Sequence, residues 1–179
     1  LARHLVSKDI PKPTPLSKEE MTWRLYGYFG DESVMAKKAL QPVLGYMQGD
    51  SASRDLKRYQ LAASVADLFD QYLIYRPQMM LEWEAPATWS RTKDDGYHWQ
   101  RELWVKLAES SPGSERQGLH HRAIIEQALL GQLNAECLSG KMPFQRLFVF
   151  GITSMPPMLV EMLMLLGRHI DVTLYVLNP

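Results

Sequence analysis

The sequence predicts a mainly α-helical fold that ends in a C-terminal βαβ unit. Up to about residue 138, apolar residues recur at helical spacing, and after residue 140 two short apolar runs enclose one more helical stretch. A chain of 179 residues fits one domain or slightly more. We therefore expect a helical subdomain over residues 1–140 and a partial α/β segment over residues 141–179.

Charge and cysteine content narrow the possible functions. The 20 basic and 20 acidic residues cancel, so no global field attracts nucleic acid or anionic lipid, and any nucleic-acid contact must be local. The single cysteine, Cys137, excludes an internal disulfide and a cysteine-based zinc site, and it fits a reducing, cytoplasmic setting. The apolar run at 155–166 contains two prolines and Glu161 and is too short to span a bilayer, so no membrane segment is expected.

The first helix follows an extended entry segment over residues 1–16, where alternate prolines disfavour helix (Pro11, Pro13 and Pro15). Ser17 and Glu20 form a capping-box pattern, which predicts a helix that continues to Phe29. Residues 33–48 predict a short helix that Pro42 interrupts, or a second helix that Pro42 begins.

The central element is a long helix over about residues 52–76, which a turn at Gly49–Asp50 precedes and Pro77 ends. A short segment at 78–83 can resume the helix. Two polar loops, at 85–96 and 110–118, are expected to flank a helix over 97–109, and a further helix is expected over 119–138.

Two strands and a helix are predicted after the turn at Ser139–Gly140. The run RLFVFG at 146–151 is continuously apolar, as in a buried parallel strand. Pro156 or Pro157 can begin a helix that ends at Gly167, and 170–177 reads as a second strand. Two strands do not form a stable parallel sheet alone, and the start at Leu1 and the abrupt end of the chain also suggest a piece of a larger protein.

The end of the long helix, at 64–77, divides into two faces at 100° per residue. The core face is predicted to carry Leu61, Val65, Leu68, Phe69, Tyr72 and Tyr75, and the opposite face Asp67, Asp70, Gln71 and Ile74. Two carboxylates and an amide at i, i+3 and i+4 lie side by side. They form either an ordinary solvated face or a set of hydrogen-bonding groups that meets a partner.

Familiar catalytic motifs are absent from the sequence. It contains no phosphate-binding loop of the G-x-x-x-x-G-K-[ST] type, no G-x-G-x-x-G, no G-x-S-x-G and no H-E-x-x-H. His120 and His121 are neighbours, but adjacent helical residues point about 100° apart, which disfavours a metal site. The strand RLFVF is followed by Gly151, Ile152, Thr153 and Ser154, with no carboxylate to hold Mg²⁺. We therefore expect no catalytic residue, metal or cofactor.

Several motifs resemble the RecC family, the gamma chains of exodeoxyribonuclease V. They are ADLFDQYLIYRP at 66–77, Trp99-Gln100 with Leu103-Trp104, His121-Arg122-Ala123, FVFGITSMPP at 148–157 and HIDVTLYVLNP at 169–179. The resemblance implies a fragment of an inactivated superfamily 1 helicase-like α/β domain with an inserted helical subdomain. Residues 1–140 would then be helicase 1B-like, and residues 141–179 helicase 1A-like.

The resemblance also implies a function: a noncatalytic subunit of the RecBCD complex that acts in recombinational double-strand break repair. Such a subunit holds its partners RecB and RecD, helps to split the duplex at forked DNA, and scans the 3′-ended single strand for the Chi hotspot. The family's scanning positions correspond here to Asp67, Leu68, Asp70, Gln71, Arg76 and Arg122. Other scanning positions of the family lie outside this sequence, so the isolated segment should show little Chi specificity.

The chemistry of these side chains is compatible with base reading. Carboxylates accept hydrogen bonds from exocyclic amino groups, glutamine donates and accepts, and arginine pairs with guanine or phosphate or stacks on bases. Leu68 falls on the core face and would brace the site. An alternative is a protein-interaction module that contacts RecB or RecD without reading DNA. An active helicase or nuclease domain is a third possibility, against which the missing motifs argue.

Overall fold

The computed structural model describes residues 1–6, 8, 10, 16–48, 51–85, 96–110, 121–135, 138, 142–152 and 154–176. Several features predicted from sequence lie outside these residues: the three alternate prolines, the turn at Gly49–Asp50, most of both polar loops, His120, Cys137, Ser139–Gly140 and Thr153. The chain divides into two compact units, Lys12–Ala123 and Leu1–Pro11 with Ile124–Pro179. The predicted boundary at residue 140, between a helicase 1B-like subdomain and a partial helicase 1A-like segment, stays a prediction.

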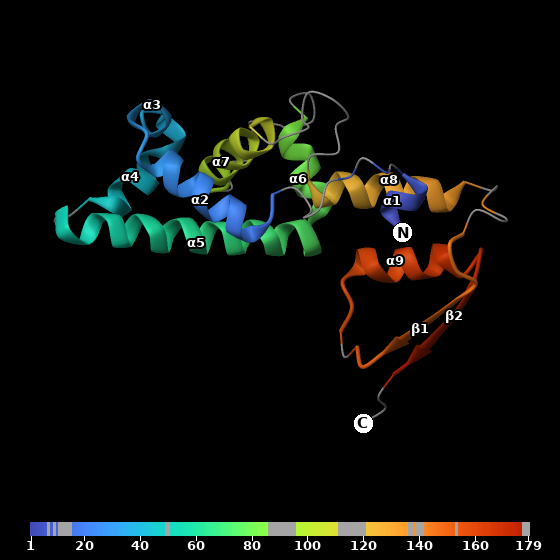
Figure 1. Cartoon of the computed structure of the whole chain (residues 1–179). Helices are drawn as coiled ribbons and strands as arrows, with labels where there is room; N and C mark the ends of the chain where they lie inside the picture. The colour runs from blue at the N-terminus through green and yellow to red at the C-terminus, as the bar shows by residue number, and fades with distance from the viewer. Residues whose placement is uncertain are drawn as a thin grey trace. The chain divides into compact units, whose positions relative to one another are not determined.

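The first unit is helical (Figure 1). Its elements are α2 (Lys18–Phe29), α3 (Glu32–Met35), the 3₁₀ helix η1 (Lys38–Leu40), α4 (Gln41–Met47), α5 (Ser51–Tyr75), α6 (Pro77–Glu84) and α7 (His98–Glu109). These bounds confirm the predicted helices within a few residues. Pro42 and Pro77 both lie in the first turn of a helix, where the N–H that proline lacks would have no intrahelical partner.

The core of the helical unit is organised along α5, beside which α2 runs (Figure 1). Phe69 is fully buried, and its ring meets that of Trp104 from α7 edge-on at 5.6 Å. The buried stripe of α5 comprises Ala62, Val65, Ala66, Phe69 and Leu73. Tyr75 was predicted on this face, but it is 59% exposed, because it lies about 120° around the helix from Phe69.

The second unit contains α1 (Ala2–Leu5), most of α8 (Arg122–Asn134), β1 (Arg146–Phe150), α9 (Pro157–Leu166) and β2 (Asp171–Tyr175). The strands pair in parallel, from Arg146 opposite Asp171 to Phe150 opposite Tyr175, and α9 covers one face of the sheet (Figure 1). The predicted strand–helix–strand unit is therefore confirmed. Its buried core consists of Leu129, Leu133, Leu138, Leu163, Leu166 and Ile170.

Three sequence-based expectations are wrong in this unit. The first strand was expected to be buried, but Phe148 and Phe150 are 51% and 66% exposed, because nothing among the described residues covers the face away from α9. A short helix, α1, lies within the entry segment that was expected to be extended. The helix predicted over 119–138 is shorter, since His121 and Leu138 are not helical. In the described part of the chain, no helix is both long and apolar enough to cross a bilayer.

Candidate nucleic-acid interface

The C-terminal half of α5 presents a hydrogen-bonded polar group, which comprises Lys18, Asp67 and Gln71 and is called the Asp67 group below. The ammonium of Lys18, from the first turn of α2, forms an ion pair with Asp67 Oδ1. The other carboxylate oxygen, Oδ2, accepts a hydrogen bond of 3.1 Å from Gln71 Nε2. The predicted proximity of Asp67 and Gln71 at i and i+4 is therefore confirmed, and a cation from a second helix joins them.

The electrostatics of the Asp67 group follow from this contact. The hydrogen bond and charge of Lys18 hold the pKa of the Asp67 carboxyl below its ordinary value of 3.8. The same contact raises the pKa of Lys18, and the nearby carboxylate of Asp70 adds to that effect. Lys18 therefore balances part of the negative charge on this face, which lowers the repulsion that two bare carboxylates would exert on a phosphate backbone.

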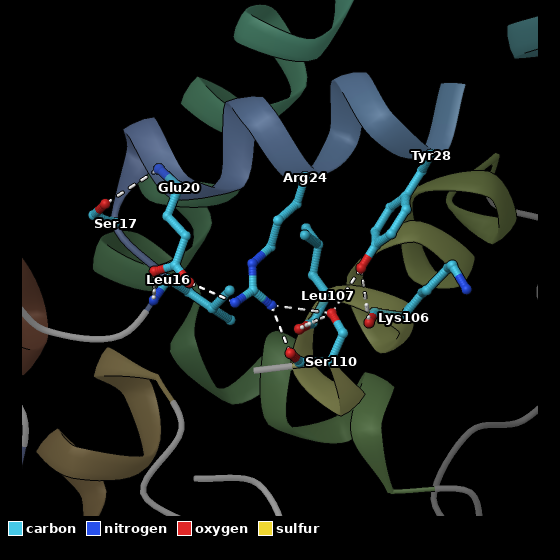
Figure 2. Close-up of polar contacts among 8 residues, drawn as sticks. All are labelled: Leu16, Ser17, Glu20, Arg24, Tyr28, Lys106, Leu107 and Ser110. Carbon is cyan, nitrogen blue, oxygen red and sulfur yellow. Dashed lines mark hydrogen bonds and ion pairs between the residues drawn. The ribbon is translucent and has the colours of Figure 1, made fainter. Parts of the chain in front are cut away.

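The N-cap of α2 directly precedes Lys18, and its hydrogen bonds are drawn in Figure 2. The Ser17 hydroxyl accepts a hydrogen bond of 3.2 Å from the Glu20 backbone N–H, as the capping-box pattern predicted. The reciprocal bond differs from the usual capping box, because the Glu20 carboxylate accepts from the N–H of Leu16 at 3.0 Å. Lys18 directly follows this cap, so the cap fixes the backbone from which the Lys18 side chain reaches α5.

A second set of contacts ties α2 to the end of α7 (Figure 2). Arg24 donates to Glu20 Oε1 at 2.6 Å and to the backbone oxygen of Ser110 at 2.8 Å. The Tyr28 hydroxyl lies 2.7 Å from Ser110 Oγ. These bonds, together with the α2–α5 packing, fix the face of α2 from which Lys18 reaches α5.

Asp70 and Gln71 carry hydrogen-bond acceptors that remain available in the C-terminal half of α5. No hydrogen bond reaches the Asp70 carboxylate or Gln71 Oε1 within the part of the chain that the structure describes. Asp70 is partly exposed and Gln71 is exposed. Asp67 differs from them, since both of its oxygens already accept hydrogen bonds. The outward chemistry of this face is therefore that of adjacent hydrogen-bond acceptors.

The remaining predicted site residues occupy three different environments. Arg76 is exposed at the junction of α5 and α6, with its guanidinium 5.6 Å from the centre of the Tyr72 ring. Leu68 is half-buried at the edge of the core stripe, where it can support the polar face. Arg122 is exposed at the start of α8. Leu68, Arg76 and Arg122 thus stand outside the Asp67 group.

A buried polar cluster fixes the residue that precedes Arg122. His121 is fully buried, and its Nε2 lies 2.6 Å from Glu84 Oε1 at the end of α6. The same oxygen accepts a hydrogen bond of 2.9 Å from Trp104 Nε1, and the Trp104 and His121 rings lie 5.1 Å apart. The sequence analysis disfavoured a metal site at His121 but did not predict its observed partner, a carboxylate distant in sequence.

Sequence reasoning missed Lys18 because 49 residues separate it from Asp67. The cap pattern located the helix start, but no periodicity reveals which face of α2 meets α5. Among the described residues, no three histidines, cysteines or carboxylates lie close enough together to hold a metal ion.

The fold is mainly helical with a parallel strand–helix–strand segment, and α5 presents a face of hydrogen-bonding side chains. The family model described as the RecC N-terminal domain matches residues 1–179, so the chain belongs to the RecC N-terminal domain family.

Curated relatives agree with this assignment. The RecBCD enzyme subunit RecC of Escherichia coli K12 is 31% identical over 174 residues, which cover 97% of this chain and 15% of that protein. The RecBCD enzyme subunit RecC of Haemophilus influenzae is 29% identical over 195 aligned residues, covering 98% of this chain and 17% of that protein. The chain therefore spans about one sixth of the length of these relatives.

Proposed function

We propose that this chain is a noncatalytic segment of a RecBCD complex, in which it scaffolds partner subunits and scans 3′ single-stranded DNA for Chi during double-strand break repair. Its relatives are named RecBCD enzyme subunit RecC, and membership in the family supports the same assembly here. The observation that carries the proposal is the acceptor-rich face of α5, where the Asp67 group, with the amide oxygen of Gln71, lies beside Asp70 in the sequence.

This face favours base reading over nonspecific binding to phosphates. Carboxylate and amide oxygens accept hydrogen bonds from base edges but gain nothing from the phosphate backbone. Arg76 and Arg122 supply exposed cations for guanine edges, phosphates or base stacking, and Leu68 supports the face from its edge. In this proposal the DNA strand passes along the C-terminal half of α5.

We assign the scaffold role and the lack of catalysis to the chain as a whole, not to the face of α5 alone. We assign residues 1–140 to a helicase 1B-like subdomain and residues 141–179 to part of a helicase 1A-like domain that has lost ATP hydrolysis. Among the described residues after β1, Gly151, Ile152 and Ser154 offer no carboxylate for Mg²⁺. The proposed partners are RecB, RecD and forked DNA, in the cytoplasm. ATP hydrolysis by the isolated chain would contradict this assignment.

The scanning role is tested with Asp70→Asn and Arg76→Ala in the full-length subunit, reconstituted into the three-subunit complex. We expect normal assembly and duplex unwinding but loss of the Chi-dependent change from degradation to a protected 3′ tail. The matched controls are Asp55→Asn and Arg54→Ala, exposed residues of the same charges near the other end of α5. Unchanged Chi switching in the Asp70 and Arg76 variants, together with failed assembly, would contradict the scanning role.

A second candidate, binding to a partner subunit, is favoured by a separate exposed cluster. Trp23 and Tyr59 are 58% and 44% exposed, and their rings lie 5.8 Å apart. Trp23 also meets the ring of Tyr26, over which the Arg58 guanidinium lies at 3.9 Å. Tryptophan, tyrosine and arginine are the residue types that dominate protein interfaces. The test is Trp23→Ala in the full-length subunit. If less complex assembles, and the complex that does form still responds normally to Chi, this second role is supported.

A further inference from the structure

The Asp67 group determines which atom of the Gln71 amide faces outward. An amide carries its oxygen and nitrogen on opposite sides of the same carbon, so a hydrogen bond that holds the nitrogen also orients the oxygen. Gln71 Nε2 donates to Asp67 Oδ2 at 3.1 Å. Gln71 Oε1 is therefore directed away from Asp67, and the carboxylate of Asp70 lies one residue earlier on the same helix.

Lys18 keeps Asp67 in the arrangement that orients this amide. Without a cation, the Asp67 carboxylate could turn toward solvent or accept from DNA directly. The ion pair with Lys18 occupies Oδ1 and leaves Oδ2 toward Gln71. The lowered pKa of Asp67 agrees with a carboxylate that is stabilised in its ionised, acceptor-only form. Lys18 directly follows the N-cap residue Ser17, whose hydroxyl accepts from the Glu20 N–H and fixes the start of α2.

We propose that Lys18 and Asp67 are positioning residues that lock Gln71 as an acceptor, so that Gln71 Oε1 and the Asp70 carboxylate select a base with an exocyclic amino group. This inference rests on the proposed scanning role and assigns it a specificity. Asp67 then acts through Gln71 instead of touching the base, and Lys18 joins the recognition machinery although it was not predicted from sequence. A freely rotating amide would accept amino and keto groups alike, because it can present either its oxygen or its nitrogen.

The test uses the full-length subunit in the reconstituted complex and hotspot DNA in which single bases are replaced by analogues that lack the amino group. Hypoxanthine replaces guanine and unsubstituted purine replaces adenine, at one position at a time. The measured quantity is the fraction of 3′ ends that become protected at the hotspot. For the native complex we expect the analogue to lower the protected fraction about tenfold at the position that Gln71 reads. This ratio between the normal base and its analogue is the discrimination, and one well-placed hydrogen-bonding contact supplies about this factor.

Removing the orienting contact should reduce this discrimination selectively. In Lys18→Met and Asp67→Asn we expect it to fall to about twofold at that same position, because the amide can then turn. The control Lys37→Met removes a surface ion pair of similar exposure, between Lys37 and Glu102, and should leave the discrimination at its native value.

The double variant Asp67→Asn with Gln71→Glu separates positioning from simple structural damage. A glutamate presents an oxygen in every orientation, so it needs no orienting partner, and the pair keeps one carboxylate. We expect this variant to recover the discrimination that Asp67→Asn loses. Full discrimination in Lys18→Met and Asp67→Asn, or no recovery in the double variant, would overturn the inference. A normal Chi response in Gln71→Ala would instead contradict the proposed scanning role itself.

Discussion

The two units of the chain bury their apolar residues to very different degrees. In the helical unit Lys12–Ala123, the large core side chains Phe69, Trp83 and Trp104 are all less than 2% exposed. In the other unit, the sheet is covered by α9 on one face, while Phe148, Phe150 and Tyr175 are more than half exposed on the opposite face. The Phe150 and Tyr175 rings stack at 4.6 Å on this open face.

This difference follows from where helices and strands find partners for their backbone hydrogen bonds. A helix forms its hydrogen bonds within itself, so neighbouring helices can complete a core from local sequence. A parallel strand needs neighbouring strands for its hydrogen bonds and layers on both faces for its side chains. The described residues provide two strands and one covering helix. The helical unit is therefore a closed core, whereas the sheet unit retains an apolar face.

The largest expected effect compares the same substitution in the two units. Phe69→Ala removes a fully buried ring that packs on Trp104, which should lower the free energy of unfolding by about 3–5 kcal/mol. Phe150→Ala removes a ring that is 66% exposed, and its cost should be below about 1 kcal/mol. Urea denaturation of the purified chain, followed by tryptophan fluorescence and circular dichroism, measures both.

The fluorescence signal separates the units, because all five tryptophans lie between Trp23 and Trp104, in the helical unit. Phe150→Ala should therefore leave the fluorescence midpoint unchanged. If both substitutions shifted this midpoint equally, the two units would unfold as one body, and the contrast between a closed and an open unit would not hold.

The sequence predicted the elements of both units except α1, but it did not predict how exposed the sheet is. Helix positions followed from local signals such as the cap at Ser17, Pro42 near the start of α4, and Pro77, which was predicted to end α5 and also begins α6. The burial of β1 was predicted wrongly, because an apolar run does not reveal how many layers surround it.

For the candidate site, too, local geometry was predictable from sequence and contacts between helices were not. The neighbouring positions of Asp67, Asp70 and Gln71 follow from helix geometry, whereas the contact with Lys18 depends on how two helices pack. The assignment of all six positions to DNA reading stays a prediction, which the variants proposed above test.

A pair of glycine substitutions compares packing constraints with backbone constraints. At Gly30 a Cβ would meet the Arg58 guanidinium, so alanine should move this flexible group off Tyr26 at a cost of about 0.5–1 kcal/mol. At Gly151 nothing lies within 4 Å, but φ is +68°, and alanine there should cost about 1–2 kcal/mol. The Gly30→Ala loss should be visible by fluorescence, and the Gly151→Ala loss by circular dichroism alone.

Gly27→Ala is the control for the glycine pair. Gly27 lies inside α2, and nothing is within 4 Å of the position of its Cβ. Alanine should therefore stabilise the helical unit by about 0.5–1 kcal/mol through the lower entropy of the unfolded chain. A destabilising Gly27→Ala would show that helix α2 is less regular than described.

The cap of α2 should have a smaller effect on stability, which tests how much of the closed core depends on helix ends. Ser17→Ala removes the hydrogen bond from the Glu20 N–H and should cost about 1 kcal/mol by tryptophan-monitored denaturation. Ser17→Asp should keep the native value, because aspartate caps helices equally well. An equal loss in both variants would contradict a capping role for residue 17.

The smallest effect on stability, and the most specific, concerns the pH dependence of the Asp67 group. The pKa of Asp67 is lowered in the folded chain by Lys18, so its contribution to stability is present above the unfolded value near 3.8 and is lost as pH falls through the lower folded value. In Lys18→Met the pKa of Asp67 should rise back toward 3.8, as measured by NMR titration of its carboxyl carbon. Asp31 gives an internal control in the same spectrum, because its pKa is lowered mainly by the Ser33 hydroxyl, which this variant leaves intact. A low pKa for Asp67 that persists in Lys18→Met would assign the shift to the helix itself, and would remove Lys18 from the set of residues that orient Gln71.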